Sequence, residues 1–164
     1  MSTARELRTL ARQLNTRLKL NQQVLTTAES CTGGMIAKLV TDIAGSSEVF
    51  ELGFVTYSNA AKQAQLGVDE RVLNQFGAVS EQTVLAMAEG ALRVSGANWS
   101  IAVSGIAGPG GASEGKPVGT VWLAWGERGV ALSSERIYLP GNRDAVRRAS
   151  AAIAMRGLLT RLDG

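Results

Sequence analysis

Residues 24–42 read VLTTAESCTGGMIAKLVTD, and three local patterns follow one another there. Val24 to Ala28 is a short run typical of a β-strand, and residues 35–42 carry apolar side chains at helical spacing. Between them, Ser30 to Gly34 combine two hydroxyls, one thiol and two glycines, which indicates a tight turn. We therefore expect a strand, a glycine-rich turn and a helix in succession, as in the repeating unit of an α/β domain.

The rest of the chain continues this alternation of helices and strands. The remaining expected elements are a helix over 7–18, strands over 50–57, 99–103, 119–125 and 130–139, a helix after Ser58 or Asn59, a helix ending at Gly77, a long helix capped by Ser80 and a last helix over 142–162. Residues 127–129 are predicted to form a hairpin, so at least one strand pair is antiparallel. We predict an α/β fold over residues 1–164, a single-domain three-layer α/β/α sandwich with a mixed sheet.

The chain contains no histidine among its 164 residues, which narrows the chemistry open to it. A Ser-His-Asp arrangement and a metal site built from imidazoles are both excluded. The single cysteine, Cys31, can form no internal disulfide and no multi-cysteine metal site, in agreement with a reducing compartment. We expect no metal, and any nucleophile must be activated by another kind of side chain.

Charge and hydropathy predict a globular protein that acts on a small molecule. The hydrophobic share is 45% and the formal net charge is +3, with one basic cluster at Arg143, Arg147 and Arg148. That modest charge argues against nucleic-acid binding. Residues 1–12 lack the apolar stretch of a signal peptide, and no run approaches the roughly 20 apolar residues of a membrane span. We expect a cytoplasmic location and neither a membrane nor a nucleic-acid partner.

The turn after the first strand offers two candidate nucleophiles. At Ser30 we expect the hydroxyl to be exposed and the N–H groups of the following helix to stabilise nearby negative charge, although a simple helix cap uses the same residue type. Cys31 is the better nucleophile as a thiolate, although a lone cysteine is also typical of a small buried core residue. The residue pattern alone leaves both open.

Two further candidates flank the junction between the second strand and the next helix. A neutral lysine in a dry pocket, such as Lys62, can take a proton from a serine near neutral pH. The phenol of Tyr57 can donate or relay a proton. A solvated helix lysine and an amphipathic residue at a strand end are the alternatives.

Residues 104–111, SGIAGPGG, form a loop rich in glycine. This loop lacks the Gly-Lys-Ser/Thr ending of a P-loop and the dinucleotide-binding spacing, which disfavours nucleoside triphosphates. Arg143 begins the last helix, where it can clamp a phosphate together with the helix N–H groups or can be a surface arginine.

Five short motifs occur in the order and spacing of one known family: TAESCTGG (27–34), VTYSN (55–59) with Lys62, GAVS (77–80), SGIAGP (104–109) and KPVGTV (116–121). On these motifs, nearly the whole chain resembles the CinA C-terminal domain family, and it is most similar to the stand-alone nicotinamide-nucleotide amidases. The resemblance implies hydrolysis of the carboxamide of nicotinamide mononucleotide to nicotinic acid mononucleotide and ammonia, in pyridine nucleotide salvage, without a cofactor.

The resemblance also implies roles for individual residues. Ser30 would be the nucleophile, Lys62 its base and Tyr57 a partner in proton transfer, and an acyl-enzyme would form and be hydrolysed. N–H groups from the Ser30 turn or the Ser104 loop would bind the oxyanion. The expected substrate-binding residues are Cys31, Thr32, Gly33, Gly34, Ser104, Gly105, Gly108 and Arg143.

The chain departs from the family pattern at two positions, since Asn142 and Gly110 stand where aspartates are expected. These departures concern loop detail and substrate binding rather than the type of reaction. We expect a homo-oligomer, with a dimer favoured. The alternative function is a nucleotide-sensing or protein-interaction module of the competence and DNA-damage type without catalysis.

Overall fold

Helices and strands alternate along residues 2–164, which a computed structural model describes; Met1, the first residue of the predicted domain, lies outside them. The helices are α1 (Ala4–Leu20), α2 (Met35–Thr41), α3 (Asn59–Leu66), α4 (Glu70–Phe76), α5 (Glu81–Ser95) and α6 (Arg143–Asp163), with a short 3-10 helix, η1 (Ser46–Glu48). The strands are β1 (Leu25–Glu29), β2 (Phe50–Val55), β3 (Trp99–Gly105), β4 (Thr120–Glu127) and β5 (Ser133–Tyr138).

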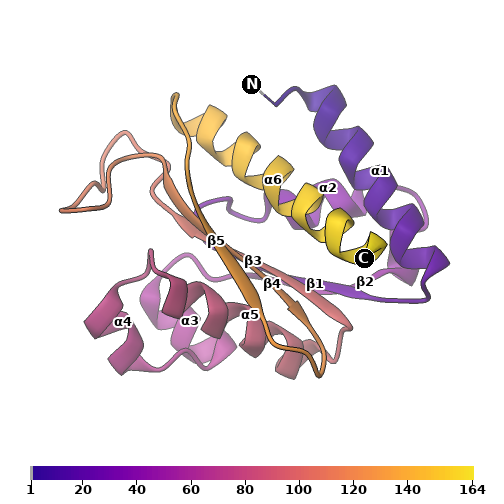
Figure 1. Cartoon of the computed structure of the whole chain (residues 1–164), viewed down its shortest axis with the longest axis horizontal. Coiled ribbons are helices and arrows are strands. Elements are labelled where there is room, and N and C mark those ends of the chain that lie inside the picture. Colours follow the sequence, from indigo (N-terminus) through magenta and orange to yellow (C-terminus); the bar gives the residue numbers. More distant parts are fainter. Residues whose placement is uncertain (1) are drawn as a thin grey trace.

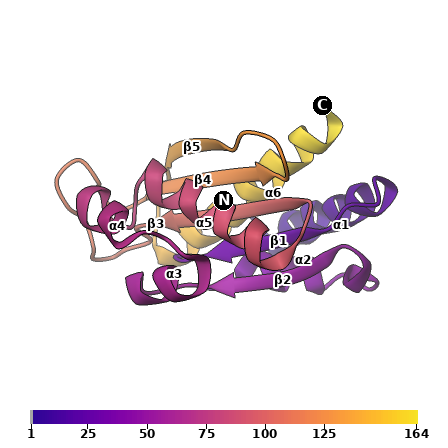
Figure 2. The same ribbon diagram turned by 90° about the horizontal axis from the view of Figure 1, so that it is seen from below.

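The five strands form one mixed sheet in the order β2-β1-β3-β4-β5, and Figure 2 shows them side by side in this order. β1 is parallel to β2 and β3, whereas β4 is antiparallel to β3 and β5. Helices α1, α2 and α6 cover one face of the sheet and α3, α4 and α5 cover the other (Figure 1). The predicted single-domain three-layer α/β/α fold with a mixed sheet is therefore confirmed.

The path of the chain puts a crevice at the carboxyl ends of the parallel strands. The chain leaves β1 through α2 on one face, and it returns from β2 to β3 through α3, α4 and α5 on the other face. In open α/β sheets, ligands bind outside the carboxyl ends of the strands where the connections diverge in this way. The turn after β1 and the loop after β3 both lie at that edge.

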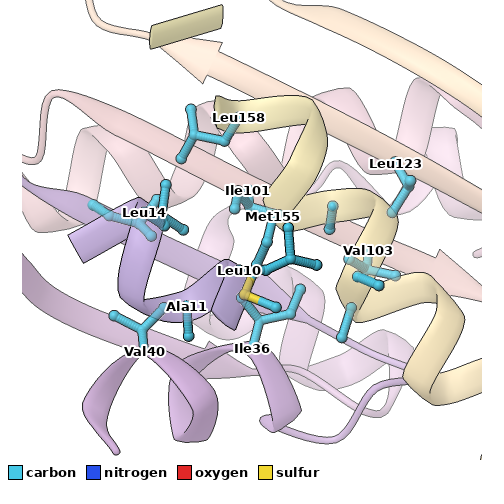
Figure 3. Packing of buried hydrophobic residues seen from close by; sticks show 14 of the residues in the cluster. Leu10, Ala11, Leu14, Ile36, Val40, Ile101, Val103, Leu123, Met155 and Leu158 are labelled. Atoms are coloured by element: carbon cyan, nitrogen blue, oxygen red, sulfur yellow. The ribbon is translucent and has the colours of Figure 1, made fainter. Parts of the chain in front are cut away.

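A hydrophobic core fills the space on each side of the sheet. Figure 3 shows the larger cluster, in which side chains of α1, α2 and α6 pack against those of β3 and β4. The second cluster lies under α3, α4 and α5 and includes Leu66 and Met87. Among residues 2–164, no helix combines the length and apolar character needed to cross a bilayer.

Side-chain caps start the helices that matter for the crevice. The Ala61 N–H donates to Ser58 Oγ at 3.0 Å, so Ser58 rather than Asn59 caps α3 and places Lys62 in its first turn. The predicted cap at Ser80 is confirmed by the Thr83 N–H, which donates to its Oγ at 3.2 Å. Such caps satisfy N–H groups that lack a partner within the helix.

The predicted hairpin between the last two strands is longer in the structure. β4 extends to Glu127 and β5 begins at Ser133, so residues 128–132 form the connection instead of 127–129. The Arg128 side chain donates to the carbonyls of Ala97 and Leu92, which ties the start of this connection to the end of α5. The next strand therefore begins further along the sequence, at Ser133.

One glycine sets the distance between the helix that carries Lys62 and its neighbour. A Cβ atom at Gly90, on α5, would lie 2.0 Å from the carbonyl oxygen of Leu66, at the end of α3. Because that oxygen belongs to the backbone, α3 as a whole would have to move. Gly90 therefore fixes how closely α3 approaches the sheet.

We predict that Gly90→Ala lowers the free energy of unfolding by about 1–3 kcal/mol, as overpacking does. Helix propensity alone would favour alanine by about 1 kcal/mol, so the clash opposes and exceeds that gain. Urea unfolding measures the difference. The matched control is Gly110→Ala, where a Cβ atom meets nothing within 4 Å. Its free energy of unfolding should equal that of the parent. A Gly90→Ala protein as stable as the parent would contradict the close approach.

Candidate active site

A cavity of about 190 Å³ opens at the carboxyl ends of β1 and β3. Its walls come from segments far apart in the sequence, including the turn after β1, the start of α3 and the first residue of α6. The lining residues are Ser30, Cys31, Tyr57, Asn59, Lys62, Ala78, Val79, Ser104, Gly105, Ala107 and Arg143. Seven of the predicted site residues line it, and they come from four different segments of the chain, which the fold brings to one place.

Ser30 follows directly on β1 and is fixed by its backbone. Its N–H donates to the carbonyl of Val103 at 3.0 Å, which continues the pairing of β1 with β3. Its side-chain oxygen lies 3.0 Å from Lys62 Nζ, within hydrogen-bond distance. Ser30 is 8% exposed, so its hydroxyl can be reached from the cavity while most of the residue is enclosed.

Lys62 is buried, with 1% of its surface exposed. Its Nζ donates to Ser30 Oγ and, at 2.9 Å, to the carbonyl of Thr56. No carboxylate among residues 2–164 forms an ion pair with it. Burial lowers the pKa of Lys62 from its usual 10.5, because the charged ammonium loses its hydration without gaining a counter-ion. The neutral amine can then accept a proton from Ser30.

Tyr57 lies at the rim of the cavity and is 60% exposed. Its hydroxyl oxygen accepts a hydrogen bond from Arg143 Nη2 at 2.7 Å. Within the described part of the chain, the structure does not bring this hydroxyl into hydrogen-bond contact with Ser30 or Lys62. Because its oxygen accepts from Arg143, its own O–H stays available to donate into the cavity.

Arg143 is the first residue of α6 and joins two parts of the cavity wall. Besides Tyr57, it reaches the carbonyl of Gly108, to which Nη1 donates at 2.9 Å. Arg143 forms no ion pair within residues 2–164. Its positive charge therefore remains available to an anionic group of a ligand.

Cys31 lines the cavity beside Ser30 but differs from it electrostatically. Burial raises the pKa of the Cys31 thiol to about 12, so the thiolate is strongly disfavoured. The hydrogen bond from Lys62 goes to Ser30 and not to the thiol. Of the two candidate nucleophiles, the geometry therefore gives Ser30 the basic partner.

The other predicted binding residues of the turn do not line the cavity. Thr32 is fully buried, and its hydroxyl donates to Glu29 Oε1 at 2.7 Å. Gly33 and Gly34 have φ angles of +61° and +94°, which favour glycine and turn the chain into α2. These residues shape the turn from behind.

The last two residues of β3, Ser104 and Gly105, contribute to the cavity wall. Ser104 is buried in the cavity wall, where its hydroxyl donates to the carbonyl of Ala78 at 2.7 Å, and Gly105 lies beside it. Gly108 does not line the cavity, and its carbonyl holds Arg143 instead.

Glu29 is a residue of this region that the sequence interpretation missed. Its fully buried carboxyl group accepts hydrogen bonds from the N–H groups of Ile36, at 2.8 Å, and Ala37, at 3.0 Å, in addition to that from Thr32. Burial raises the pKa of Glu29, while these hydrogen bonds and the charge of Arg147 act in the opposite direction. The helix N–H groups that we expected to face an external anion are therefore already occupied by this side chain.

Arg147 was noticed in the sequence only as part of a basic cluster. Its guanidinium donates to the carbonyls of Cys31 and Thr32, both at 3.1 Å, from one helical turn beyond Arg143. The four-residue spacing on one helix was the available signal, because such residues share a face. Asn59, Ala78, Val79 and Ala107 complete the lining, and each lies inside one of the motifs quoted above.

Comparison with known proteins agrees with this arrangement. Nicotinamide-nucleotide amidohydrolase PncC of Pseudomonas putida is 54% identical over 151 residues, which cover 92% of this chain and 94% of that protein. The protein of the same name from Escherichia coli K12 is 52% identical over 157 residues, with 95% and 94% covered. The crystal structure of the competence/damage inducible protein CihA from Agrobacterium tumefaciens matches with a TM-score of 0.92 at 46% identity, covering 97% of this chain and 96% of that chain.

The model of the CinA C-terminal domain matches residues 7–162, so it spans both layers of helices and every segment that lines the cavity. The resemblance seen in the motifs thus extends over the fold and the whole sheet. On this match and on these relatives, the chain belongs to the CinA C-terminal domain family.

Proposed function

We propose that this protein is a nicotinamide-nucleotide amidase, which hydrolyses nicotinamide mononucleotide to nicotinic acid mononucleotide and ammonia. The observation that carries the proposal is the 3.0 Å contact between Ser30 Oγ and the buried Lys62 Nζ at the carboxyl end of β1. The relatives named nicotinamide-nucleotide amidohydrolase supply the substrate, because they share about half of their residues with this chain over nearly its full length.

The reaction begins with attack by Ser30. Neutral Lys62 accepts the hydroxyl proton as Ser30 Oγ forms a bond to the carboxamide carbon, whose oxygen becomes an oxyanion. The C–N bond then breaks, the proton passes from Lys62 to the leaving nitrogen, and ammonia departs. What remains is a nicotinoyl ester on Ser30.

Water completes the cycle by the same route. Lys62, neutral again, takes a proton from a water molecule that adds to the ester carbon, and the returning proton restores the Ser30 hydroxyl as the acid product leaves. Tyr57 is our proposed partner in these proton transfers, since its O–H is free to donate at the rim of the cavity. No step draws on a group outside this chain, its substrate and water.

Arg143 is the proposed contact for the phosphate of the nucleotide. A guanidinium presents paired donors that suit phosphate oxygens, and this one has no carboxylate partner in the described chain. Cys31, Ser104 and Gly105 line the same cavity as Arg143 and Ser30, and we propose that the ribose and the pyridine ring bind there. The expected homo-oligomer and the cytoplasmic location stay predictions.

We predict that purified protein, with a chelator present, releases ammonia from nicotinamide mononucleotide and that Ser30→Ala lowers kcat at least about a thousandfold, as loss of a catalytic serine does. An enzyme-coupled ammonia assay measures both. Cys31→Ala should keep a rate far above that of Ser30→Ala. Thermal stabilisation by the nucleotide without any ammonia release would favour the alternative of a sensing module, and equal rates in Ser30→Ala and the parent would sink the serine mechanism.

We predict that kcat/KM rises with pH through the lowered pKa of Lys62, below the usual 10.5, because only the neutral amine accepts a proton. At pH values below that pKa, the rate should fall about tenfold per pH unit. Lys62→Arg should be inactive throughout, since a guanidinium stays protonated. Lys38→Ala, an exposed lysine on α2, is the matched control and should keep the parent profile.

The same pKa can be checked without activity. In the unfolded chain lysine keeps its proton up to about pH 10.5, whereas folded Lys62 releases it at a lower pH. The free energy of unfolding of the parent protein should therefore rise with pH between the lowered pKa of folded Lys62 and pH 10.5. Lys62→Met should therefore be more stable than the parent at neutral pH, and the gap should close as the pH rises through that window. A difference in free energy of unfolding between Lys62→Met and the parent that does not change with pH would argue that the pKa of Lys62 is not lowered.

We predict that Arg143→Ala raises KM for nicotinamide mononucleotide by roughly 10- to 100-fold, the value of a charge-assisted hydrogen bond. The KM for nicotinamide riboside, which lacks the phosphate, should change much less. Arg148→Ala, whose side chain pairs with Asp144 on the same helix, is the control. Equal losses on both substrates would instead point to a role for Arg143 through Tyr57.

A further inference from the structure

The turn after β1 has three consecutive carbonyl groups, and a hydrogen bond holds each of them. Ser30 O accepts from the Gly33 N–H at 3.0 Å. Cys31 O accepts from Arg147 Nε, and Thr32 O from Arg147 Nη2, both at 3.1 Å. In a planar trans peptide the N–H points away from the carbonyl of the same unit. The three held carbonyls share their peptide units with the N–H groups of Cys31, Thr32 and Gly33. They therefore fix the directions of these three N–H groups.

Two of those N–H groups have no acceptor in another residue among 2–164. The N–H of Gly33 is used inside the turn, but neither Cys31 N nor Thr32 N forms a hydrogen bond to another residue of the described chain. Cys31 is 6% exposed and Thr32 is fully buried. Buried backbone N–H groups without a partner are rare in folded proteins. An acceptor from outside the chain is therefore expected at Cys31, which lines the cavity, whereas Thr32 does not line it.

The position of Cys31 shows where that acceptor would lie. Cys31 lines the cavity next to Ser30, and its N–H belongs to the residue that directly follows the candidate nucleophile. In other serine hydrolases with a strand-turn-helix nucleophile, the N–H of this following residue contributes to the oxyanion hole. The N–H groups of α2, by contrast, serve Glu29 and are unavailable to a ligand.

Arg147 is suited to hold this turn because its planar fork spans two neighbouring carbonyls. A Cβ atom at residue 33 would lie 2.8 Å from Arg147 Nη2, so the absence of a side chain at Gly33 lets the guanidinium lie against the turn. An ammonium group, which is a single point charge, could not keep both contacts in this geometry.

We propose that Arg147 is a positioning residue for catalysis: it holds the carbonyl of Thr32, whose peptide carries the Gly33 N–H that holds the Ser30 carbonyl, and so fixes the direction in which the Cys31 N–H binds the oxyanion formed when Ser30 attacks. The inference rests on the proposed amidase function. Arg147 does not line the cavity and, in the described chain, forms no hydrogen bond with the Ser30 side chain; it acts through the two carbonyls, keeping the Cys31 N–H in place before the charge develops.

The test compares Arg147→Ala and Arg147→Lys with the matched control Arg148→Ala on the same helix. We expect kcat for nicotinamide mononucleotide to fall about 10- to 100-fold in both Arg147 variants, somewhat less than deletion of a donor itself, while KM changes by less than about threefold. Arg148→Ala should keep the parent kcat. Guanidinium ion, added well below denaturing concentrations, should restore part of kcat in Arg147→Ala and none in Arg147→Lys.

Three outcomes would overturn the positioning role. The first is an unchanged kcat in the Arg147 variants. The second is a rise in KM with kcat unchanged, which would mark a phosphate contact. The third is a loss of activity equal to the unfolded fraction of the protein, with no rescue by guanidinium. If Arg147→Ala does not fold, Arg147→Lys carries the same comparison.

A readout without turnover separates this inference from the function on which it rests. A parent protein that releases no ammonia contradicts the amidase function and not the geometry of the turn. In ¹⁵N spectra without ligand, the amide signals of Cys31 and Thr32 should shift in Arg147→Ala and stay in place in Arg148→Ala. Ala107, on the facing loop that Arg147 does not touch, is the internal reference. Unmoved signals for Cys31 and Thr32 would overturn the inference.

Discussion

The burial of the Glu29 carboxyl group is the constraint on which the rest of the site depends. A carboxyl group without exposed surface must find donors within the protein, and Glu29 finds them in Thr32 and in the first N–H groups of α2. Its backbone carbonyl accepts from the Thr56 N–H at 2.9 Å, and the carbonyl of Thr56 in turn holds Lys62. One residue at the end of β1 thus anchors both the turn that contains Ser30 and the segment that carries Lys62.

The electrostatics of the cavity follow from what is kept away from Lys62. A carboxylate beside the amine would favour its charged form, whereas a hydroxyl and a carbonyl leave burial as the dominant influence on its pKa. The Glu29 carboxyl group is hydrogen-bonded to Thr32 and to the start of α2 instead of to Lys62, and Arg143 lies at the rim of the cavity without an ion-pair partner in the described chain. A chain without histidine thereby has a buried amine whose pKa is lowered by burial and, at the rim of the cavity, a guanidinium without an ion-pair partner in the described residues.

Much of this arrangement could be predicted from the sequence because the relevant signals are local. The strand, turn and helix around Ser30, the caps at Ser58 and Ser80, and the junction that brings Tyr57 near Lys62 all follow from neighbouring residues. Resemblance to a family then favoured Ser30 over Cys31, a choice that the residue pattern had left open, and the positions of these residues around one cavity agree with it. The roles themselves stay predictions.

What could not be predicted depends on contacts between segments far apart in the chain. Nothing near Glu29 indicates that its side chain, and not a ligand, occupies the start of α2. The contacts of Arg147 with the turn, more than a hundred residues away, arise only when α6 packs beside α2. The longer connection before β5 has a similar origin, since Arg128 is held by the end of α5.

The distribution of the site over both helical layers also has a consequence for the folding of the protein. The proposed nucleophile, Ser30, follows a central strand, the proposed base, Lys62, lies on a helix of one layer, and Arg143 and Arg147 lie on the last helix of the other layer. No half of the chain contains a working set, so a partly folded intermediate with native-like helices would be inert. Enzymatic activity should therefore report on completion of folding, and its return during refolding should lag behind the recovery of secondary structure.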